Sequence, residues 1–457
     1  MPGLAVDHPS ETPSKWNPLD ALGLHRPELR AWAMYDWANS AMVTTIIAAV
    51  FPIFYSKVAS HGLPTEVADR NFAWSSTIAM VIIAVVAPIL GVIADQRPIK
   101  KKLLGSFMAL GIAAVASMFF IAQGDWLLAS VLFIVANIGA NGSFVFYDAM
   151  LPHIADEHEI DRVSTAGYAL GYVGGGLLLM ANLAWILKPE WFGLPSGPNL
   201  TSAQASLPAR LAFLSVAIWW LVFSIPLFLR VPEPKVRRVE SQGSPIREAF
   251  ARLGATFGEL KKYRQGLLML VAFLIYNDGI GTIFRMATIY GTSKGIDSSV
   301  MIASLVLVQF VGIPFAFLFG GLAGRFGSKN LILFTLVVYI FISILGYFME
   351  TSWHFVLLAI LVGTVQGGSQ ALSRSLFAGL IPRDKSGEFF GFFAVMEKFA
   401  GIFGPALFAI SIQLTGSTRN SILTVIPFFI VGGALLMMVN VEEGRKLAKA
   451  AEGSGTV

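Results

Sequence analysis

The feature that most constrains this chain is a series of apolar stretches, each about 20 residues long, that recur along its whole length. A helix of that length spans a bilayer, and its backbone polar groups are satisfied internally. Only 13% of the 457 residues are charged and 55% are hydrophobic, whereas soluble domains carry about 25% charged residues. The sequence therefore predicts an all-α integral membrane protein. Twelve spans are expected, near 33–56, 73–94, 103–122, 127–149, 165–187, 209–230, 265–288, 299–323, 330–349, 353–376, 389–413 and 421–440.

The lysines and arginines divide unequally between the segments that connect these spans. The two termini and the even-numbered loops hold 24 of the 33 basic residues, and the remaining loops hold 6. Because positive residues are retained in the cytoplasm, both termini are expected on the cytoplasmic side, with a bacterial plasma membrane as the expected location. The positive charge thus indicates topology, and no nucleic-acid partner is expected.

The composition also narrows the class of function. The chain has no cysteine, which excludes disulfides, thiolate metal sites and cysteine nucleophiles. It has no phosphate loop, His-Glu-x-x-His pair or haem-ligand pattern. His153 and His158 share an acidic loop, which we interpret as solvated rather than as a metal site. We therefore expect a monomer that is not an enzyme and needs no metal or cofactor, with a coupling proton left open.

A polar segment at 231–263 divides the spans into two sets of six. One face of this segment repeats apolar residues at intervals of three and four, as in an amphipathic helix: Ile246, Phe250, Leu253, Phe257 and Leu260. That helix is expected either on the membrane surface or in solvent. The predicted organisation is a cytoplasmic tail at 1–30, a six-helix bundle at 31–230, this linker, a second six-helix bundle at 264–440 and a cytoplasmic tail at 441–457. The first thirty residues have no apolar core, so no cleaved signal peptide is expected.

The two halves repeat weakly at an offset of 229 residues. Gly91 and Asp95, at the end of the second span, align with Gly320 and Gly324 at the end of the eighth. The same offset aligns two polar pairs in the fourth and tenth spans, Asn137 with Gln366 and Asn141 with Gln370. Such a repeat is typical of a transporter built from two related bundles.

The pattern Gly91-x-x-x-Asp95, followed by Arg97 and lysines, resembles the signature loop of the major facilitator superfamily, although Gln96 and Pro98 depart from it. The resemblance implies two pseudo-symmetric six-helix bundles, with this loop latching the cytoplasmic side. Asp148 and Arg374 lie near the cytoplasmic ends of their spans. The residues predicted at a cytoplasmic gate are Gly91, Asp95, Arg97, Asp148, Gly320, Arg325 and Arg374.

Longer strings resemble the vacuolar-effluxer, autophagy-related branch of that superfamily. They are YDWANSA at Tyr35–Ala41, YNDGIGTI at Tyr276–Ile283, GYALGYVGGG in the fifth span and Gly401-x-x-Gly404-Pro405 in the eleventh. Eukaryotic members of the branch are linked to amino-acid export from vacuoles, so the resemblance implies transport of a small molecule. The spacing of Gly167, Gly171 and Gly175 also suits close helix packing. The stretch Gly171-Tyr172-x-x-Gly175-Gly176 resembles the antiporter motif of the superfamily and differs from it at one residue, Tyr172.

Ionisable groups within spans are costly and usually mark a transport or proton pathway. Asp278 lies near the middle of the seventh span, and Arg285 lies two turns further along the same face. An acid and an arginine on one wall suit the two charges of an amino acid, whereas an interhelix ion network is the structural alternative. Gly279 and Gly281 beside the acid suggest either a loosened helix or close packing.

Further polar side chains allow two interpretations each. Asp36 either faces the pathway or anchors a helix end, and the amides of the fourth and tenth spans either ligate substrate or join helices. Glu397 either carries a proton or is neutralised by a basic neighbour. The full set predicted along the substrate or proton pathway is Tyr35, Asp36, Asn39, Asn137, Asn141, Asn277, Asp278, Arg285, Gln366, Gln370, Glu397 and Lys398.

The sequence therefore predicts a secondary transporter that works by alternating access and exports amino acids or similar small solutes, with proton coupling left open. A carrier for drug or metabolite efflux, or for uptake, is the alternative within transport. A lipid scramblase or flippase is the alternative from another class.

Overall fold

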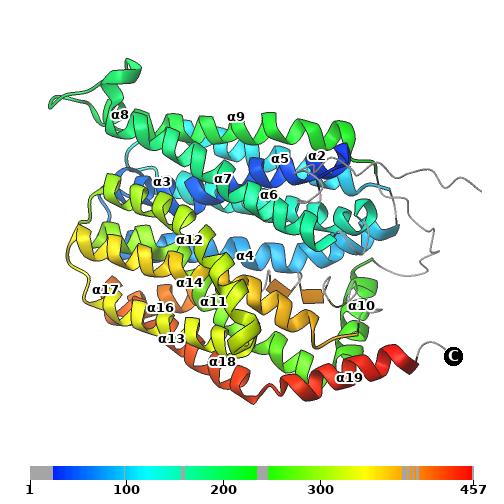
Figure 1. Ribbon diagram of the computed structural model, residues 1–457. Helices are drawn as coiled ribbons and strands as arrows, with labels where there is room; N and C mark the ends of the chain where they lie inside the picture. Colours follow the sequence, from blue (N-terminus) through cyan, green and yellow to red (C-terminus); the bar gives the residue numbers. More distant parts are fainter. Residues whose placement is uncertain are drawn as a thin grey trace, which may run out of the picture.

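The computed structural model describes residues 24–96, 98–155, 160–233, 245–382, 389, 392–393, 396–397 and 401–454, and all the regular structure in these ranges is helical (Figure 1). Eleven helices of the described part are long and apolar enough to cross a membrane. Apolar side chains also cover their outer faces, as shown by Ile218 and Val337, which are 62% and 63% exposed. The predicted all-α, multi-pass membrane architecture is therefore confirmed.

The first half supplies six spans. The first span combines α2 (Pro27–Ala41), a π-helical stretch (Met42–Ala49), α3 (Val50–Phe54) and a π-helical turn (Tyr55–Ala59). The others are α4 (Thr65–Gln96), α5 (Lys100–Ser117) with a short 3-10 turn, α6 (Trp126–Ile154), α7 (Ile160–Leu187) and α9 (Leu207–Arg230), with the short α8 (Ser202–Ala205) before α9.

The second half follows α10 (Pro245–Leu260), which forms in the predicted linker and contacts both α4 and α11. Its spans are α11 (Arg264–Ser293), α12 (Ser298–Phe326), α13 (Ser328–Tyr347) and α14 (Ser352–Ala378), then α16 (Phe403–Thr415) and a last span of α17 (Thr418–Ser421), a 3-10 turn (Ile422–Val425) and α18 (Ile426–Met438). A polar helix, α19 (Val441–Ser454), ends the described chain.

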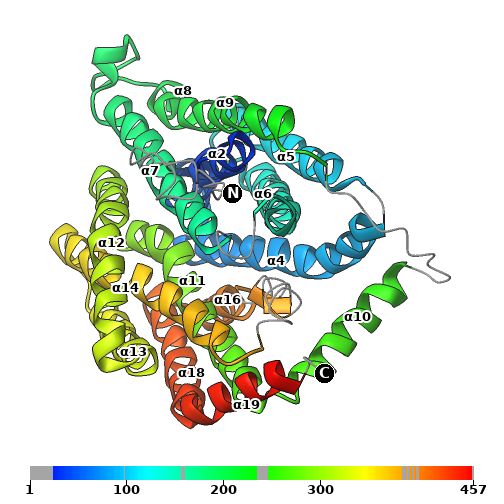
Figure 2. The ribbon, with the colours of Figure 1, turned by 45° about the vertical axis from the view of Figure 1, so that its right-hand side comes forward.

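The twelve spans form two bundles that lie side by side (Figures 1 and 2). Between the bundles, the second span of each half contacts the fifth span of the other: α4 packs on α16, and α12 packs on α7. The first span packs on the seventh, α11. This reciprocal pairing is the pattern expected of two related halves with a pseudo-two-fold axis.

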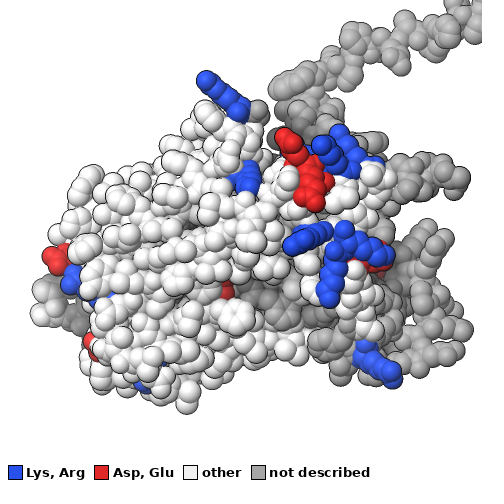
Figure 3. All heavy atoms as spheres, turned by 90° about the horizontal axis from the view of Figure 1, so that it is seen from below, with Lys and Arg blue, Asp and Glu red and all other residues white. Residues whose placement is uncertain are grey.

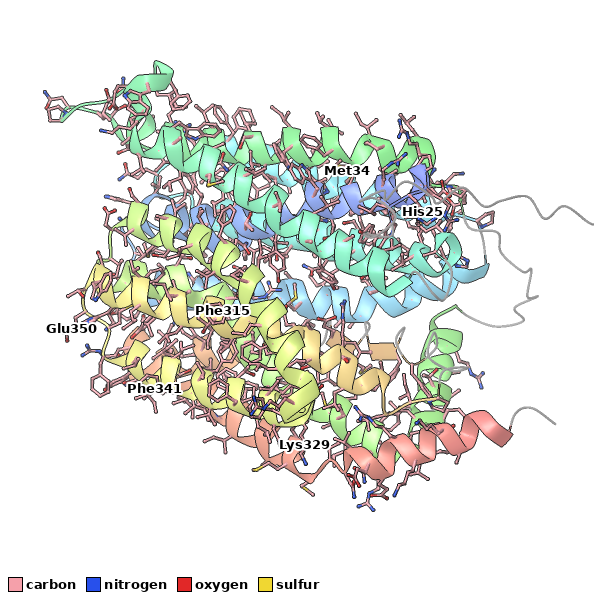
Figure 4. All side chains as sticks on the ribbon, in the orientation of Figure 1. His25, Met34, Phe315, Lys329, Phe341 and Glu350 are labelled. Carbon is pink, nitrogen blue, oxygen red and sulfur yellow. The ribbon has the colours of Figure 1, made fainter. Side chains whose placement is uncertain are left out.

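Two lysines repeat the same structural role in the two halves. Lys101, near the start of the third span, donates Nζ to the carbonyls of Phe228 at 2.9 Å and Val231 at 2.7 Å, at the end of the sixth. Lys329, near the start of the ninth span, donates to the carbonyls of Met437 and Val439, both at 2.8 Å, at the end of the twelfth (Figure 4). Each lysine thereby satisfies carbonyls left unpaired at a helix C-terminus. The two halves therefore repeat this contact, at an offset of 228 residues (329 − 101), one residue from the 229 of the sequence repeat.

The eleventh span differs from the predicted continuous helix at 389–413. Gly401 has φ +105°, a conformation that favours glycine, and α16 begins only at Phe403 and has 13 residues. Of the two alternatives for the seventh span, a loosened helix is not found, because α11 runs unbroken through Gly279 and Gly281. A Cβ on Gly279 would lie 2.8 Å from the ring of Phe429, so this glycine serves close packing.

Charged side chains gather at the two ends of the molecule and leave a broad uncharged belt between them (Figure 3). We call the end that carries α10 and α19 the basic end, and the other the far end. Lys and Arg are more numerous at the basic end in this view, whereas Glu350 lies at the far end (Figures 3 and 4). The belt has the distribution expected for a membrane-embedded surface.

The buried apolar side chains show which end of the molecule is closed. One continuous core joins the first bundle to residues near the far ends of second-bundle helices, including Met286, Ile289 and Met301. We call this shared part the far-end seal. Toward the basic end, the second bundle has a separate core that includes Met269, Phe273 and Phe377. Among the described residues, apolar packing joins the two bundles at the far end, whereas the described core toward the basic end belongs to the second bundle alone.

The orientation of the molecule is testable because the natural chain has no cysteine. Cysteine at exposed Trp191, in the loop between α7 and α9, is expected to react with a membrane-impermeant maleimide on intact cells. Cysteine at exposed Arg325, at the basic end of α12, is expected to react only after the membrane is permeabilised. Unmodified protein is the control, and the reverse labelling pattern would contradict the predicted topology.

Candidate functional site

Asp278 lies midway along α11 and is 2% exposed. Its carboxylate is directed at the start of α16, where Oδ2 accepts the backbone N–H of Phe403 at 3.1 Å and Oδ1 accepts that of Gly404 at 3.0 Å. An acid on the seventh span thus caps the interrupted eleventh span. A Cβ on Gly404 would lie within 2.8 Å of Asp278 Oδ1, so the glycine is needed for this approach.

The first turn of α16 is satisfied almost completely by this arrangement. A helix leaves its first four N–H groups without intrahelical partners, and each such group is costly to leave unpaired in a membrane. Asp278 takes two of them, Pro405 has no N–H, and the N–H of Ala406 reaches the carbonyl of Ile402 at 3.3 Å. The negative carboxylate also complements the positive end of the helix dipole.

Arg285 lies seven residues beyond Asp278 on α11, next to Met286 of the far-end seal. Its side chain reaches α4 in the other bundle, where Nη2 lies 3.6 Å from the sulfur of Met80. Its Nη1 is buried and has no hydrogen-bond partner among the described residues. The predicted pair of charges is therefore present, but the acid binds α16 while the guanidinium faces the first bundle.

Tyr35 and Asn39 of α2 are fully buried inside the first bundle. Asn39 Nδ2 donates to the hydroxyl of Tyr35 at 3.4 Å and to Ser143 of α6 at 3.3 Å. In the second bundle the hydroxyl of Tyr276 on α11 pairs with Ser373 of α14 at 2.5 Å. A tyrosine on the first span of each half is thus tied to a serine on the fourth span, which is again a repeated contact.

Asp36 lies against α7, 6% exposed, and accepts a hydrogen bond from the hydroxyl of Tyr147 at 3.4 Å. The predicted row of glycines lets α7 approach it: a Cβ on Gly171 would lie 2.5 Å from Ser40 Oγ, and one on Gly175 would lie 2.9 Å from a Thr44 methyl. Close packing by these glycines is confirmed. The role of Asp36 in the pathway stays a prediction.

The amides of the fourth and tenth spans make mostly local bonds. Asn137 donates to the carbonyl of Phe133 at 2.9 Å, and Asn141 donates to that of Asn137 at 3.0 Å, both within α6. Asn137 Oδ1 and Gln366 Oε1 are buried without a hydrogen-bond partner in the described part of the chain. Gln370 is exposed, while Asn277 and Glu397 are partly exposed. The role of these amides in the substrate pathway stays a prediction.

Toward the basic end, Arg374 of α14 joins Tyr168 of α7 across the two bundles. Its guanidinium hydrogen-bonds the tyrosine hydroxyl, and its Cζ lies 4.7 Å from the ring centroid. Asp148 and Arg325 are exposed. Arg97 and Lys398 lie outside the described residues, as does His158, and for Gly91, Asp95 and Gly320 only the helix backbone is described. The Arg374–Tyr168 contact is therefore the described feature that supports the predicted gate.

The far end carries a cross-bundle contact that hydropathy did not predict. Asp69 of α4 is fully buried, and its Oδ2 accepts a hydrogen bond from Thr418 of α17 at 2.7 Å. The apolar run predicts the second span from residue 73, but α4 begins at Thr65, so Asp69 lies inside a helix rather than in a loop. A polar hollow of about 170 Å³, lined by both bundles, adjoins Thr418.

The first span contacts the seventh through an irregular stretch that was also missed. Residues Met42–Ala49 are π-helical, and the hydroxyl of Thr288 on α11 donates to the carbonyl of Ala48 at 2.6 Å. π-Helical segments are rare and often occur at functional sites. Apolar run length gives no signal for this local change in winding.

These features, two pseudo-symmetric bundles with polar groups between them, define a transporter of the major facilitator class. Solved structures of this class share the fold. The D-xylose–proton symporter aligns with a TM-score of 0.68 over 91% of this chain and 98% of its own, at 14% identity. A bacterial homologue of the human lysosomal transporter Spinster, inward-facing and unoccupied, aligns with a TM-score of 0.58 over 92% of this chain and 97% of its own, at 16% identity.

Residues 25–449 match the family described as "Vacuole effluxer Atg22 like", and the chain belongs to that family. It is 38% identical to the MFS-type transporter YxiO of Bacillus subtilis (strain 168) over 90% of this chain and 94% of the relative. It is 24% identical to the autophagy-related protein 22-1 of Phaeosphaeria nodorum over 96% of this chain and 95% of the relative. These proteins are transporters rather than enzymes, which confirms the predicted family and class.

Replacing Asp278 tests the cap on α16. In Asp278→Asn, one acceptor oxygen remains for two N–H groups, and an unpaired buried N–H costs about 1–3 kcal/mol. We expect about tenfold slower transport in proteoliposomes, with expression and gel-filtration behaviour unchanged. Asp297→Asn is a matched control because Asp297 caps α12 at the far end, through Ser299 and Val300, and is expected to transport normally. Normal transport by Asp278→Asn would contradict the importance of the cap.

Replacing Thr418 tests the far-end contact. Thr418→Val removes the hydroxyl that reaches Asp69 and is expected to favour opening of the far end. The readout is the rate at which a maleimide added from the far side labels cysteine placed at Leu305, a residue of the far-end seal. Thr415→Val is the control, because in the described structure the Thr415 hydroxyl bonds only to backbone groups of its own segment. Equal labelling rates in the two variants would show that the Asp69–Thr418 contact does not hold the far end closed.

Proposed function

We propose that this protein is a secondary transporter that works by alternating access and exports amino acids or similar small solutes. The observation that carries the proposal is the asymmetry of packing between the bundles, which share an apolar core at the far end and have separate cores toward the basic end. A protein that rocks between two states needs one end sealed at a time. Its relatives in the vacuole effluxer family support export as the direction.

We further propose that the basic end faces the cytoplasm of a bacterial cell, because basic residues collect there. In that orientation the far-end seal closes the external side, and the polar groups of α6, α11 and α14 are approached from the cytoplasm. A substrate that enters from the cytoplasm would stop below the seal, at the level of Arg285. Export then requires the seal to open and the basic end to close.

Coupling to protons is the energy source we propose. Three acids are candidates for the proton: Asp278, Glu397 and Asp69. Asp278 bonds to the start of α16, and Asp69 bonds to α17 of the other bundle. A proton on either of these two carboxylates would therefore alter a contact between helices. Asp278 is the best placed, because protonation of its carboxylate removes an acceptor from the start of α16.

Purified protein in liposomes provides the test. Liposomes loaded with a mixture of unlabelled amino acids are expected to take up radiolabelled amino acids by counterflow, and an imposed pH gradient is expected to drive accumulation that a protonophore abolishes. Protein-free liposomes are the control. No flux across the amino-acid panel would contradict this substrate class, and flux that is indifferent to the protonophore would contradict proton coupling. Transfer of labelled lipid between leaflets without solute flux would favour the scramblase alternative.

A further inference from the structure

We infer that Arg285 binds the carboxylate of the transported solute, and that Asp278 does not bind its amino group. The inference rests on the proposed function, which it deepens by naming the chemical group that is recognised. It replaces the simplest expectation from sequence, in which an acid and an arginine on one helix face hold both charges of an amino acid.

Asp278 is already occupied by the protein itself. Each of its two carboxylate oxygens accepts a backbone N–H from the start of α16. The charge of the acid is therefore directed at the helix terminus. A substrate amine that competed for it would leave buried N–H groups of Phe403 and Gly404 unpaired, which is costly inside a membrane.

Arg285, in contrast, makes no ion pair within the described part of the chain, although the Asp278 carboxylate acts on it at longer range. Within the described ranges, no ion pair joins it to Asp278 or to another acid, and its one side-chain contact with a possible acceptor is the sulfur of Met80 at 3.6 Å. A thioether is a weak acceptor, and Nη1 has none. A buried guanidinium without partners is unfavourable unless an anion joins it.

The position of Arg285 in the molecule suits it to hold such an anion. It is only partly exposed, it reaches from the second bundle to α4 of the first, and it lies directly below Met286 and Ile289 of the far-end seal. An anion held there would lie between the guanidinium on α11 and α4 of the first bundle, next to the far-end seal. A planar guanidinium with several donors suits a carboxylate in particular.

The neighbouring side chains indicate the chemical character of the rest of the solute. Met80, which touches the guanidinium from α4, is apolar and buried. A small organic acid with an apolar side chain therefore fits the surroundings better than an inorganic anion. The amino group of an amino acid would be tolerated rather than required.

Three probes share the leucine side chain and differ in their charged groups, so they show which group is recognised. Leucine carries both charges, 4-methylpentanoate carries only the carboxylate, and leucinamide carries only the amine. Binding is measured as the shift of Tm of the purified full-length protein in detergent. Leucine and 4-methylpentanoate are expected to raise Tm in the unmodified protein, and leucinamide is not. A shift with leucinamide equal to that with leucine, or no shift with either carboxylate, would overturn the inference.

Variants test the residue itself. Arg285→Gln is expected to lose both carboxylate shifts, while Arg285→Lys, which keeps a charge but not the planar fork, is expected to retain a weaker one. Arg264→Gln, at an exposed position on the same helix, is the matched control and is expected to behave like the unmodified protein. Unchanged carboxylate binding in Arg285→Gln would contradict the assignment, and the three probes still test it if that variant fails to fold.

The same probes distinguish failure of the inference from failure of the proposed function. Counterflow that leucinamide inhibits as well as leucine does would contradict the Arg285 site and leave amino-acid transport standing. A carboxylate-dependent Tm shift without flux of any solute would contradict the proposed transport and leave the Arg285 site standing.

Discussion

A helix that is interrupted inside a membrane must satisfy its backbone N–H groups without water, and much of this structure depends on how the eleventh span meets that requirement. Gly401 ends the preceding segment in a conformation that favours glycine, and Asp278 from the seventh span accepts the N–H groups of Phe403 and Gly404. The cap fixes α16 to α11, and α16 also packs on α4 of the other bundle. The carboxylate thus links α11 to α16, and the packing of α16 on α4 extends this connection to the other bundle.

The same interaction determines the chemistry available between the bundles. The carboxylate of Asp278 is directed at α16 and not at Arg285. Arg285 therefore faces the other bundle without an ion pair among the described residues. The far-end seal lies immediately beyond it. Polar contacts also cross between the bundles at both ends, Asp69 with Thr418 at the far end and Arg374 with Tyr168 toward the basic end.

Much of the fold could be predicted from the sequence, because membrane insertion imposes a minimum length on each apolar run and the weak 229-residue repeat marks two related halves. Lys101 and Lys329, 228 residues apart, support the relation between the halves, since both cap the last span of their half. The candidate site was predicted less well. Asp278 and Arg285 were found from their cost in a membrane, but the partner of Asp278 lies 125 residues away, and hydropathy contains no information about such a contact. Asp69 was missed because its helix begins eight residues before the apolar run. The π-helical stretch of the first span was missed because residue composition does not distinguish a π-helix from an α-helix.

In alternating access the two bundles exchange which end of the molecule is closed, and distances between spin labels test this exchange most directly. One pair replaces Lys57 and Ser298, which bond at 2.7 Å across the far end, and the other replaces the exposed residues Lys102 and Arg325 at the basic end. In liposomes with transported solute, each pair is expected to show two distance populations, and conditions that lengthen the far-end distance are expected to shorten the basic-end distance. A single fixed distance for both pairs, or changes in the same direction, would contradict alternating access.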